Sequence, residues 1–264
     1  MRPRRCVAGN ADDGQARRLD LLALAPKPRH AAGILRTTSL LLAVAFSIAG
    51  CHTAEANVDA APYTLVYLKT GPTKGLSKER QQEVFAGHFA NMERLAQQGH
   101  LVLAGPFGTR KTDASLRGIF VLATGDEAKA RALAETDPGV VAGVFVLEYH
   151  ALATAAALPK WVAAEMARDA ALKATGKTPK PGEFGRGFVL LIGEDGASVR
   201  RELTGQKGVL LLASYDEKGA FAVLDAVDCG AATTKFGAVL PKVGAHRLED
   251  WFASRGLEQL PLMK

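Results

Sequence analysis

The pattern of apolar and polar positions is clearest between residues 62 and 153. Four segments there are rich in β-branched and aromatic residues and predict strands, at residues 63–69, 101–104, 118–123 and 141–151. Two intervening segments predict helices, at residues 78–98 and 124–136. The order βαββαβ predicts an α+β, ferredoxin-like domain with one antiparallel sheet and both helices on one face of it.

The first predicted helix has a well-defined apolar face. Ser77 provides its N-cap and Gly99 ends it. Placed at 100° per residue, His88 lies inside the apolar arc that also contains Val84 and Met92, so its imidazole is expected to face the sheet. A buried imidazole needs a hydrogen-bond partner. Two interpretations follow, namely a core histidine with a satisfied ring and a functional group.

The second predicted helix has recognisable signals at both ends. Thr124 and Glu127 form a capping box at its start. Asp137 precedes Pro138 and Gly139, and the residue before a proline disfavours helix. The helix is therefore expected to end near residue 136, and the last strand to follow after a short break.

Residues 154–183 predict a helix followed by a linker, and residues 184–264 a smaller C-terminal α+β region. Pro159 fits the first turn of the helix, where its missing N–H costs nothing. In the C-terminal region, strands are expected at residues 188–192, 208–213 and 220–227, a weak helix at 231–243, and an element of undetermined type at 246–254.

A degenerate repeat is one interpretation of this C-terminal region. Leu147-Glu148 recurs as Leu248-Glu249, at an offset of 101 residues. The region has no counterpart of the 78–98 helix, of His88 or of the Asp-Pro pair, so an unrelated small α+β unit is the default interpretation.

The N-terminal 51 residues predict a leader. The apolar run at residues 40–50 is too short to span a membrane and follows a basic flank, as in a secretory signal. Ile48-Ala49-Gly50-Cys51 resembles the lipobox of bacterial lipoproteins, whose cysteine is acylated; a plain signal peptide with a chance cysteine is the alternative. Residues 52–61 are polar and fit a tether. We therefore expect a protein lipid-anchored at Cys51 in the cell envelope, on the periplasmic or outer face of a membrane.

The charge and the cysteine content of the chain argue against some classes of binding partner. The chain has 264 residues with a net charge of +6, but residues 1–51 hold 8 of the 33 basic and 3 of the 27 acidic residues. The remainder is close to neutral, so no nucleic-acid partner is expected. The three cysteines form no metal-binding or disulfide framework, and the histidines are scattered. We expect no metal site and no cofactor.

Several short motifs between Tyr63 and Leu152 resemble those of the YCII-related (YciI-like) family. In chain order they are His88-Phe89, Ala104-Gly105-Pro106, Gly118 and Asp137-Pro138. The resemblance covers about 90 of the 264 residues. It implies the dimeric α/β-barrel version of the ferredoxin-like fold. We expect a homodimer or, if the C-terminal region is a degenerate second copy that covers the open face of the sheet, an intrachain pseudo-dimer. The resemblance also implies that His88 and Asp137 form the active-site pair.

Such a pair is suited to acid–base chemistry on a small molecule. The carboxylate would orient the imidazole and stabilise its cationic form, which leaves the other ring nitrogen free to move a proton. Proton abstraction beside a carbonyl, isomerisation or elimination from a small ring-like substrate would follow, as in an isomerase or lyase. Backbone amides after Gly105 are candidates for holding a developing oxyanion.

Other polar residues are weaker candidates. Gly105, Pro106, Ser115 and Arg117 are expected to contribute to a substrate-binding rim, although a solvated hairpin face also explains Ser115 and Arg117. His150 and Glu148 share a face of the last strand and are interpreted as polar residues at the sheet edge. The alternative function is a non-catalytic small-molecule-binding or envelope interaction module of the same fold.

Overall fold

The computed structural model describes residues 60–176 and 183–263. The elements of the first half are β1 (Ala61–Thr70), α1 (Lys78–Gln97), β2 (Leu101–Pro106), β3 (Leu116–Leu122), α2 (Glu127–Ala134), α3 (Pro138–Val141) and β4 (Phe145–Thr154). Those that follow are α4 (Leu158–Ala174), β5 (Gly185–Gly193), α5 (Gly196–Leu203), β6 (Val209–Tyr215), β7 (Gly219–Leu224), α6 (Cys229–Lys235), η1 (Leu240–Lys242), β8 (His246–Ser254) and η2 (Arg255–Leu262).

The predicted leader, with its apolar run and Cys51, lies outside the described residues, as does nearly all of the predicted tether. Within the described part of the chain, no helix combines the length and the hydropathy needed to cross a membrane.

The eight strands of the described residues belong to one antiparallel sheet in the order β2-β3-β1-β4-β6-β7-β5-β8. The first four strands have the ferredoxin-like order. The next four repeat it, with β6, β7, β5 and β8 in the places of β2, β3, β1 and β4. The second half is therefore a second copy in topology, and the default interpretation as an unrelated unit was wrong. The helix expected to be missing is present as α5, which has only 8 residues.

A shared irregularity supports the repeat. The pairing of β2 with β3 shifts register between Leu101 and Leu103. The pairing of β6 with β7 shifts between Val209 and Leu211, at the corresponding place in the second half. A bulge disrupts the ladder and bends its strand, so the same defect at equivalent positions indicates one backbone plan used twice.

The two halves join edge to edge and close the sheet. On one side β4 pairs with β6 through Leu152 and Tyr215. On the other side Phe107, next to β2, forms an antiparallel bridge with Trp251 of β8. The Trp251 indole N–H also donates to the Gly105 carbonyl, at 3.0 Å. The halves are thus paired within one chain, which removes the exposed edges that each would have alone.

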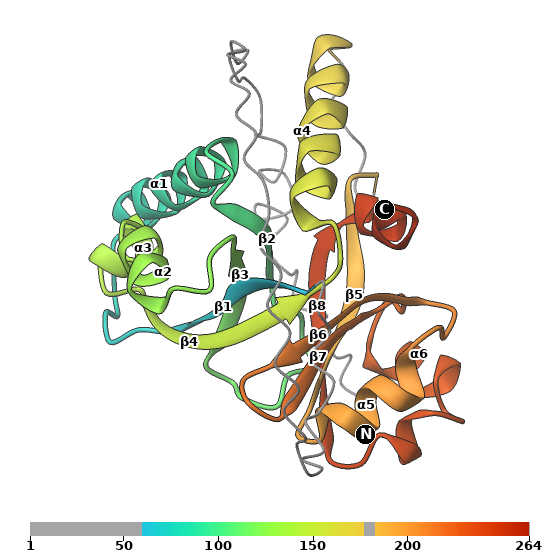
Figure 1. Ribbon diagram of the computed structural model, residues 1–264. Helices are drawn as coiled ribbons and strands as arrows, with labels where there is room; N and C mark the ends of the chain where they lie inside the picture. The colour runs from blue at the N-terminus through green and yellow to red at the C-terminus, as the bar shows by residue number, and fades with distance from the viewer. Residues whose placement is uncertain (1–59, 177–182, 264) are drawn as a thin grey trace, which may run out of the picture.

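Alternation along the strands separates a central core from two outer ones. On β1, Leu65 and Tyr67 face the centre, whereas Val66 packs against the helices of the first half. On β5, Leu190 faces the centre and Leu191 packs under α5 and α6. Figure 1 shows α1, α2 and α3 on one side of the strands and α5 and α6 on the other.

Some predicted boundaries are corrected by local hydrogen bonds. The N-cap of α2 is Asp126, whose carboxylate accepts the Lys129 N–H at 3.2 Å; Thr124 instead accepts the Asp126 N–H. Aspartate caps a helix as well as threonine does. The last strand of the first half begins at residue 145, because α3 occupies residues 138–141. The start of α4, with Pro159 in its first turn, is confirmed.

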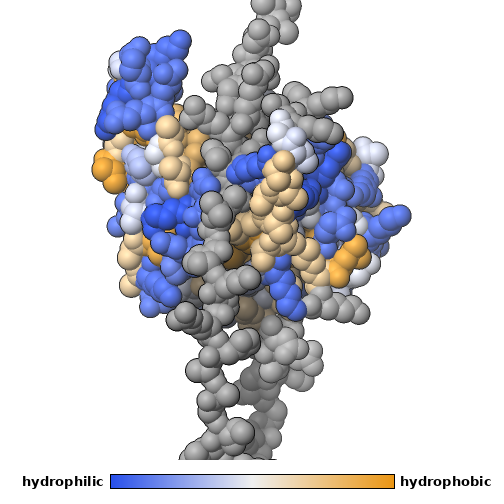
Figure 2. All heavy atoms as spheres, turned by 90° about the horizontal axis from the view of Figure 1, so that it is seen from above, coloured by the Kyte–Doolittle hydropathy of each residue, from blue (hydrophilic) through white to orange (hydrophobic). Residues whose placement is uncertain are grey.

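Large apolar side chains are exposed at isolated positions among the described residues: Val141, Val146, Val227 and Leu262. Seen from above, most of the described surface is hydrophilic, with apolar residues in smaller groups between polar ones (Figure 2).

Candidate acid–base site

His88 of α1 and Asp137, which precedes α3, form a buried pair. The His88 Nδ1 lies 2.7 Å from Asp137 Oδ2, and the two residues are 7% and 0% exposed. The other oxygen, Oδ1, accepts the Gly139 N–H at 2.8 Å. A carboxylate only accepts, so the geometry assigns the shared proton to His88 Nδ1. In the neutral ring, Nε2 then carries the lone pair and is available as a base.

The backbone explains how the pair meets. Gly87 of α1 packs against Pro138 so closely that a Cβ on Gly87 would lie 2.9 Å from the proline Cγ. Asp137 also caps α3, since its carboxylate accepts the Gly139 N–H. Asp137 could have a purely structural role at the end of a helix or a functional one as the partner of His88. In the structure this one carboxylate caps the next helix and pairs with His88.

Aromatic side chains surround the His88 ring. Phe120 stacks on it at a centroid distance of 5.8 Å, and Phe89 and Phe145 lie at 5.3 Å. These contacts, together with the bond to Asp137, restrict the imidazole to one orientation.

A cavity of about 210 Å³, here called the His88 cavity, opens next to this ring. Its polar lining comes from His88, Lys111 and Arg117, and its apolar lining is dominated by phenylalanines: Phe85, Phe89, Phe107, Phe120 and Phe145. The size and the aromatic walls fit a small planar molecule.

The predicted rim residues divide into two groups. Gly105, Pro106 and Arg117 line the His88 cavity. Ser115 does not line the cavity. Its carbonyl accepts the Thr70 N–H at 2.8 Å, and its own N–H donates to Asp113 at 2.8 Å. Ser115 shapes the hairpin between β2 and β3.

The backbone amides after Gly105 do not serve as an oxyanion hole. Pro106 has no N–H. The Phe107 N–H donates to the Arg117 carbonyl at 2.9 Å, and the Gly108 N–H donates to the Asp250 carbonyl at 2.6 Å. Each of these donors is already used by the sheet or by its closure, so the expectation of an amide-based oxyanion site fails.

Lys111 is the functional candidate that sequence reasoning missed. Its Nζ donates to the Leu116 carbonyl at 2.9 Å and lies on the lining of the His88 cavity. Burial lowers the pKa of Lys111 below its ordinary value, and the nearby positive charge of Arg117 lowers it further. Two cationic side chains therefore border a largely apolar cavity, an arrangement that favours an anion or a developing negative charge.

The second half fixes the hairpin that carries Lys111. Glu249 of β8 is fully buried, and its carboxylate accepts the Thr112 N–H at 2.7 Å and the Thr112 hydroxyl. The Asp250 carboxylate accepts the Arg110 N–H at 2.9 Å, and the Asp250 N–H donates to the Arg110 carbonyl at 2.8 Å. Residues on both sides of Lys111 are thus tied to β8.

His150 belongs to a different cluster. Its two ring nitrogens lie 2.8 Å from Glu148 and 2.8 Å from Asp216, so both are engaged with carboxylates at the seam between β4 and β6. Cys229 is buried, and its burial raises the pKa of the thiol to about 12. Among the described residues, no group of three or more histidine, cysteine, aspartate or glutamate side chains is arranged to hold a metal ion.

Comparison with known proteins finds a family match in the first half of the chain. Residues 63–153 match the family model described as YCII-related domain. One similar solved structure is 5-chloro-2-hydroxyhydroquinone dehydrochlorinase from Burkholderia phenoliruptrix AC1100, in complex with 2,5-dihydroxybenzoquinone; it is 22% identical over 33% of this chain and 90% of that chain, with a TM-score of 0.25. No curated protein matches the chain. Residues 63–153, which carry both members of the His88–Asp137 pair, form a YCII-related domain.

Proposed function

We propose that the YCII-related domain catalyses proton transfer on a small carbon acid, leading to isomerisation or elimination. One observation carries the proposal: His88, held by Asp137 at 2.7 Å, borders a cavity that Lys111 and Arg117 also line. A base, a partner for its cationic form and two charges for the developing anion are the components that such a reaction needs.

The step begins with His88. Its Nε2 takes a proton from the carbon next to a carbonyl group, and the electron pair of that C–H bond moves to the carbonyl oxygen as an enolate. Asp137 stabilises the imidazolium, while Lys111 and Arg117 stabilise the enolate oxygen. In an isomerisation, the imidazolium returns the proton at the γ carbon. In an elimination, the enolate electrons instead form the double bond and expel a leaving group with its electron pair from the β carbon, and the imidazolium gives its proton to that leaving group or to water.

A suitable test uses cyclohex-3-enone, whose double bond moves into conjugation when an α proton is removed and a γ proton added. The full chain is expected to accelerate this isomerisation, followed by ultraviolet absorbance. Replacing His88 by Ala should lower the rate by about 10²–10⁴-fold, the usual contribution of a general base. His246→Ala, at a partly exposed histidine outside the His88 cavity, is the matched control. A folded His88→Ala protein with an unchanged rate would refute the proposal.

The lipid anchor is a separate part of the proposal, supported by the lipobox-like Ile48-Ala49-Gly50-Cys51. In a bacterial host that processes lipoproteins, the full chain should incorporate a radiolabelled fatty acid. Cys51→Ser should abolish the labelling, and Cys6→Ser should not. Labelling that survives Cys51→Ser would contradict the assignment.

The alternative, a non-catalytic binding module, is favoured by the burial of His88, which is 7% exposed and packed among phenylalanines. In that case His88→Ala lowers the stability, and the wild-type chain binds small ring compounds without any turnover. Measured isomerisation by the wild type decides between the two.

A further inference from the structure

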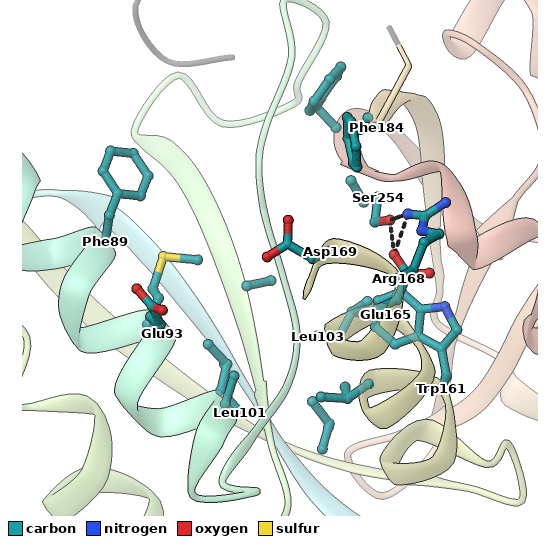
Figure 3. A pocket seen from close by; sticks show the side chains of 18 residues that line it. Phe89, Glu93, Leu101, Leu103, Trp161, Glu165, Arg168, Asp169, Phe184 and Ser254 are labelled. Atoms are coloured by element: carbon teal, nitrogen blue, oxygen red, sulfur yellow. Dashed lines mark hydrogen bonds and ion pairs between the residues drawn. The ribbon is translucent and has the colours of Figure 1, made fainter. Parts of the chain in front are cut away.

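A second cavity adjoins the acid–base site. It has a volume of about 160 Å³ and lies between α1, β2, α4 and the end of β8. We call it the α4 pocket. Its walls are mainly apolar and aromatic, including Phe89, Leu103, Trp161 and Phe184 (Figure 3).

The α4 pocket and the His88 cavity are neighbours along the same two elements. Phe89 and Met92 of α1 line both spaces. Along β2, residues 101–104 face the α4 pocket and residues 105–107 line the His88 cavity. A molecule with its reactive group at His88 therefore has an adjacent apolar space into which a substituent can extend.

Elements outside the YCII-related domain build the far wall. That domain ends at residue 153, whereas α4 begins at residue 158 and contributes Trp161 and Val162. The end of β8 adds residues 252–254. The α4 pocket is thus an addition to the domain, made by the connecting helix and the second half.

The charges at the α4 pocket favour a cation. Glu93 of α1 and Asp169 of α4 project into the space between the two helices from opposite sides (Figure 3). Asp169 is paired with Lys173 at 2.7 Å, and Glu165 with Arg168 at 2.6 Å. Glu93 accepts an amide hydrogen from the Gln97 side chain at 3.3 Å, and among the described residues no lysine or arginine forms an ion pair with it.

We propose that the α4 pocket is a subsite for an apolar extension of the substrate that ends in an amine. This inference rests on the proposed function, because it takes the reactive part of the same molecule to lie at His88. Phe89 and Phe184 would contact the apolar part, and an ammonium group would pair with Glu93 or stack on an aromatic face. The substrate class is then an arylalkyl or alkyl amine that carries a carbon acid.

Methionine methyl NMR tests occupancy without any need for turnover. Met92 lines both the α4 pocket and the His88 cavity, so its signal reports binding in either space, and the effect of changing Glu93, which lines only the α4 pocket, assigns the site. Met166 and Met263 line neither space and serve as internal references. In the full chain labelled with ¹³C-methyl methionine, 4-phenylbutylamine should shift the Met92 signal and leave the Met166 and Met263 signals in place. It should bind at least about fivefold more tightly than 4-phenylbutyrate, because a carboxylate is repelled by Glu93.

Two variants sharpen the test. Glu93→Gln should weaken binding of the amine about fivefold, and Glu83→Gln, which changes an exposed α1 glutamate paired with Arg80, should have no effect. Val162→Trp should fill the α4 pocket and abolish binding of the amine. If Val162→Trp does not fold, the two glutamate variants carry the test.

The two proposals fail in different ways. An unmoved Met92 signal, or equal affinities for the amine and the carboxylate, overturns the subsite, whatever the isomerisation rate. Amine binding that shifts Met92 in a chain without isomerase activity supports a binding pocket there and overturns the proposed function instead.

Discussion

Replacing Glu249 by Gln should destabilise the protein and loosen the hairpin that carries Lys111. Glu249 is fully buried and accepts two hydrogen bonds from Thr112, with Arg247 Nε 3.6 Å away. Glutamine preserves the shape and one acceptor oxygen for the Thr112 N–H, but its amide group then faces the Thr112 hydroxyl, which must accept instead of donate, and the negative charge that strengthened both bonds is lost.

The magnitude follows from the bonds that change. A hydrogen bond to a charged group contributes about 1.5–3 kcal/mol, and loss of the buried charge also removes part of its desolvation cost. The net loss in the free energy of unfolding should be about 2 kcal/mol. Complete removal in Glu249→Ala should cost about 3–5 kcal/mol, because the Thr112 N–H and Arg247 lose their acceptor.

Urea unfolding followed by circular dichroism measures this loss. Thr112→Val removes the hydroxyl donor alone, and a double-mutant cycle with Glu249→Gln should give a coupling energy of about 1 kcal/mol. Because Lys111 is adjacent to Thr112, the isomerisation rate should fall as well. A Glu249→Gln protein within about 0.5 kcal/mol of wild type, with additive effects in the cycle, would refute the view that β8 secures this hairpin.

Three further predictions follow. Gly87→Ala should push α1 away from Pro138, cost about 1–3 kcal/mol in urea unfolding and reduce turnover; an unchanged rate would show that the close approach is unnecessary. The Ser115 hydroxyl and N–H lower the pKa of Asp113 to about 2, so Asp113 stabilises the fold above pH 4, and this contribution is lost as the pH falls towards 2. Asp113→Asn should flatten acid unfolding in that range; an unaltered curve contradicts the assignment. Because burial raises the pKa of Cys229 to about 12, a thiol reagent at pH 8 should modify it only after unfolding.

The candidate pair was accessible from sequence because two signals agreed. Helical periodicity placed His88 on the buried face of α1, and the family resemblance joined it to Asp137. The hydrogen bonds of the backbone could not be predicted from the sequence. The N-cap of α2 is Asp126 and not Thr124, and the backbone N–H groups after Gly105 donate to the carbonyl groups of Arg117 and of β8.

Three other features could not be predicted from local sequence patterns: the position of Lys111, the internal repeat and the α4 pocket. Lys111 lies in a charged loop whose position is set by a hydrogen bond between Thr112 and Glu249, which are 137 residues apart in the chain. The repeat was obscured because α5 is short and contains Arg200, Arg201 and Glu202, which hide its apolar positions in a sequence profile. The α4 pocket arises only where α1, α4 and β8 meet, so no local pattern marks it.

The protonation state of His88 tests the central claim most directly. In ¹⁵N NMR spectra of the neutral ring, with the His88 signal assigned through His88→Ala, the wild type should show the proton on Nδ1 and a free Nε2. In Asp137→Asn, the Gly139 N–H keeps the amide oxygen as its acceptor, so the amide nitrogen faces His88. The proton should then move to Nε2, and isomerisation should be lost. The same protonated nitrogen in both proteins, with the rate unchanged, would contradict the account.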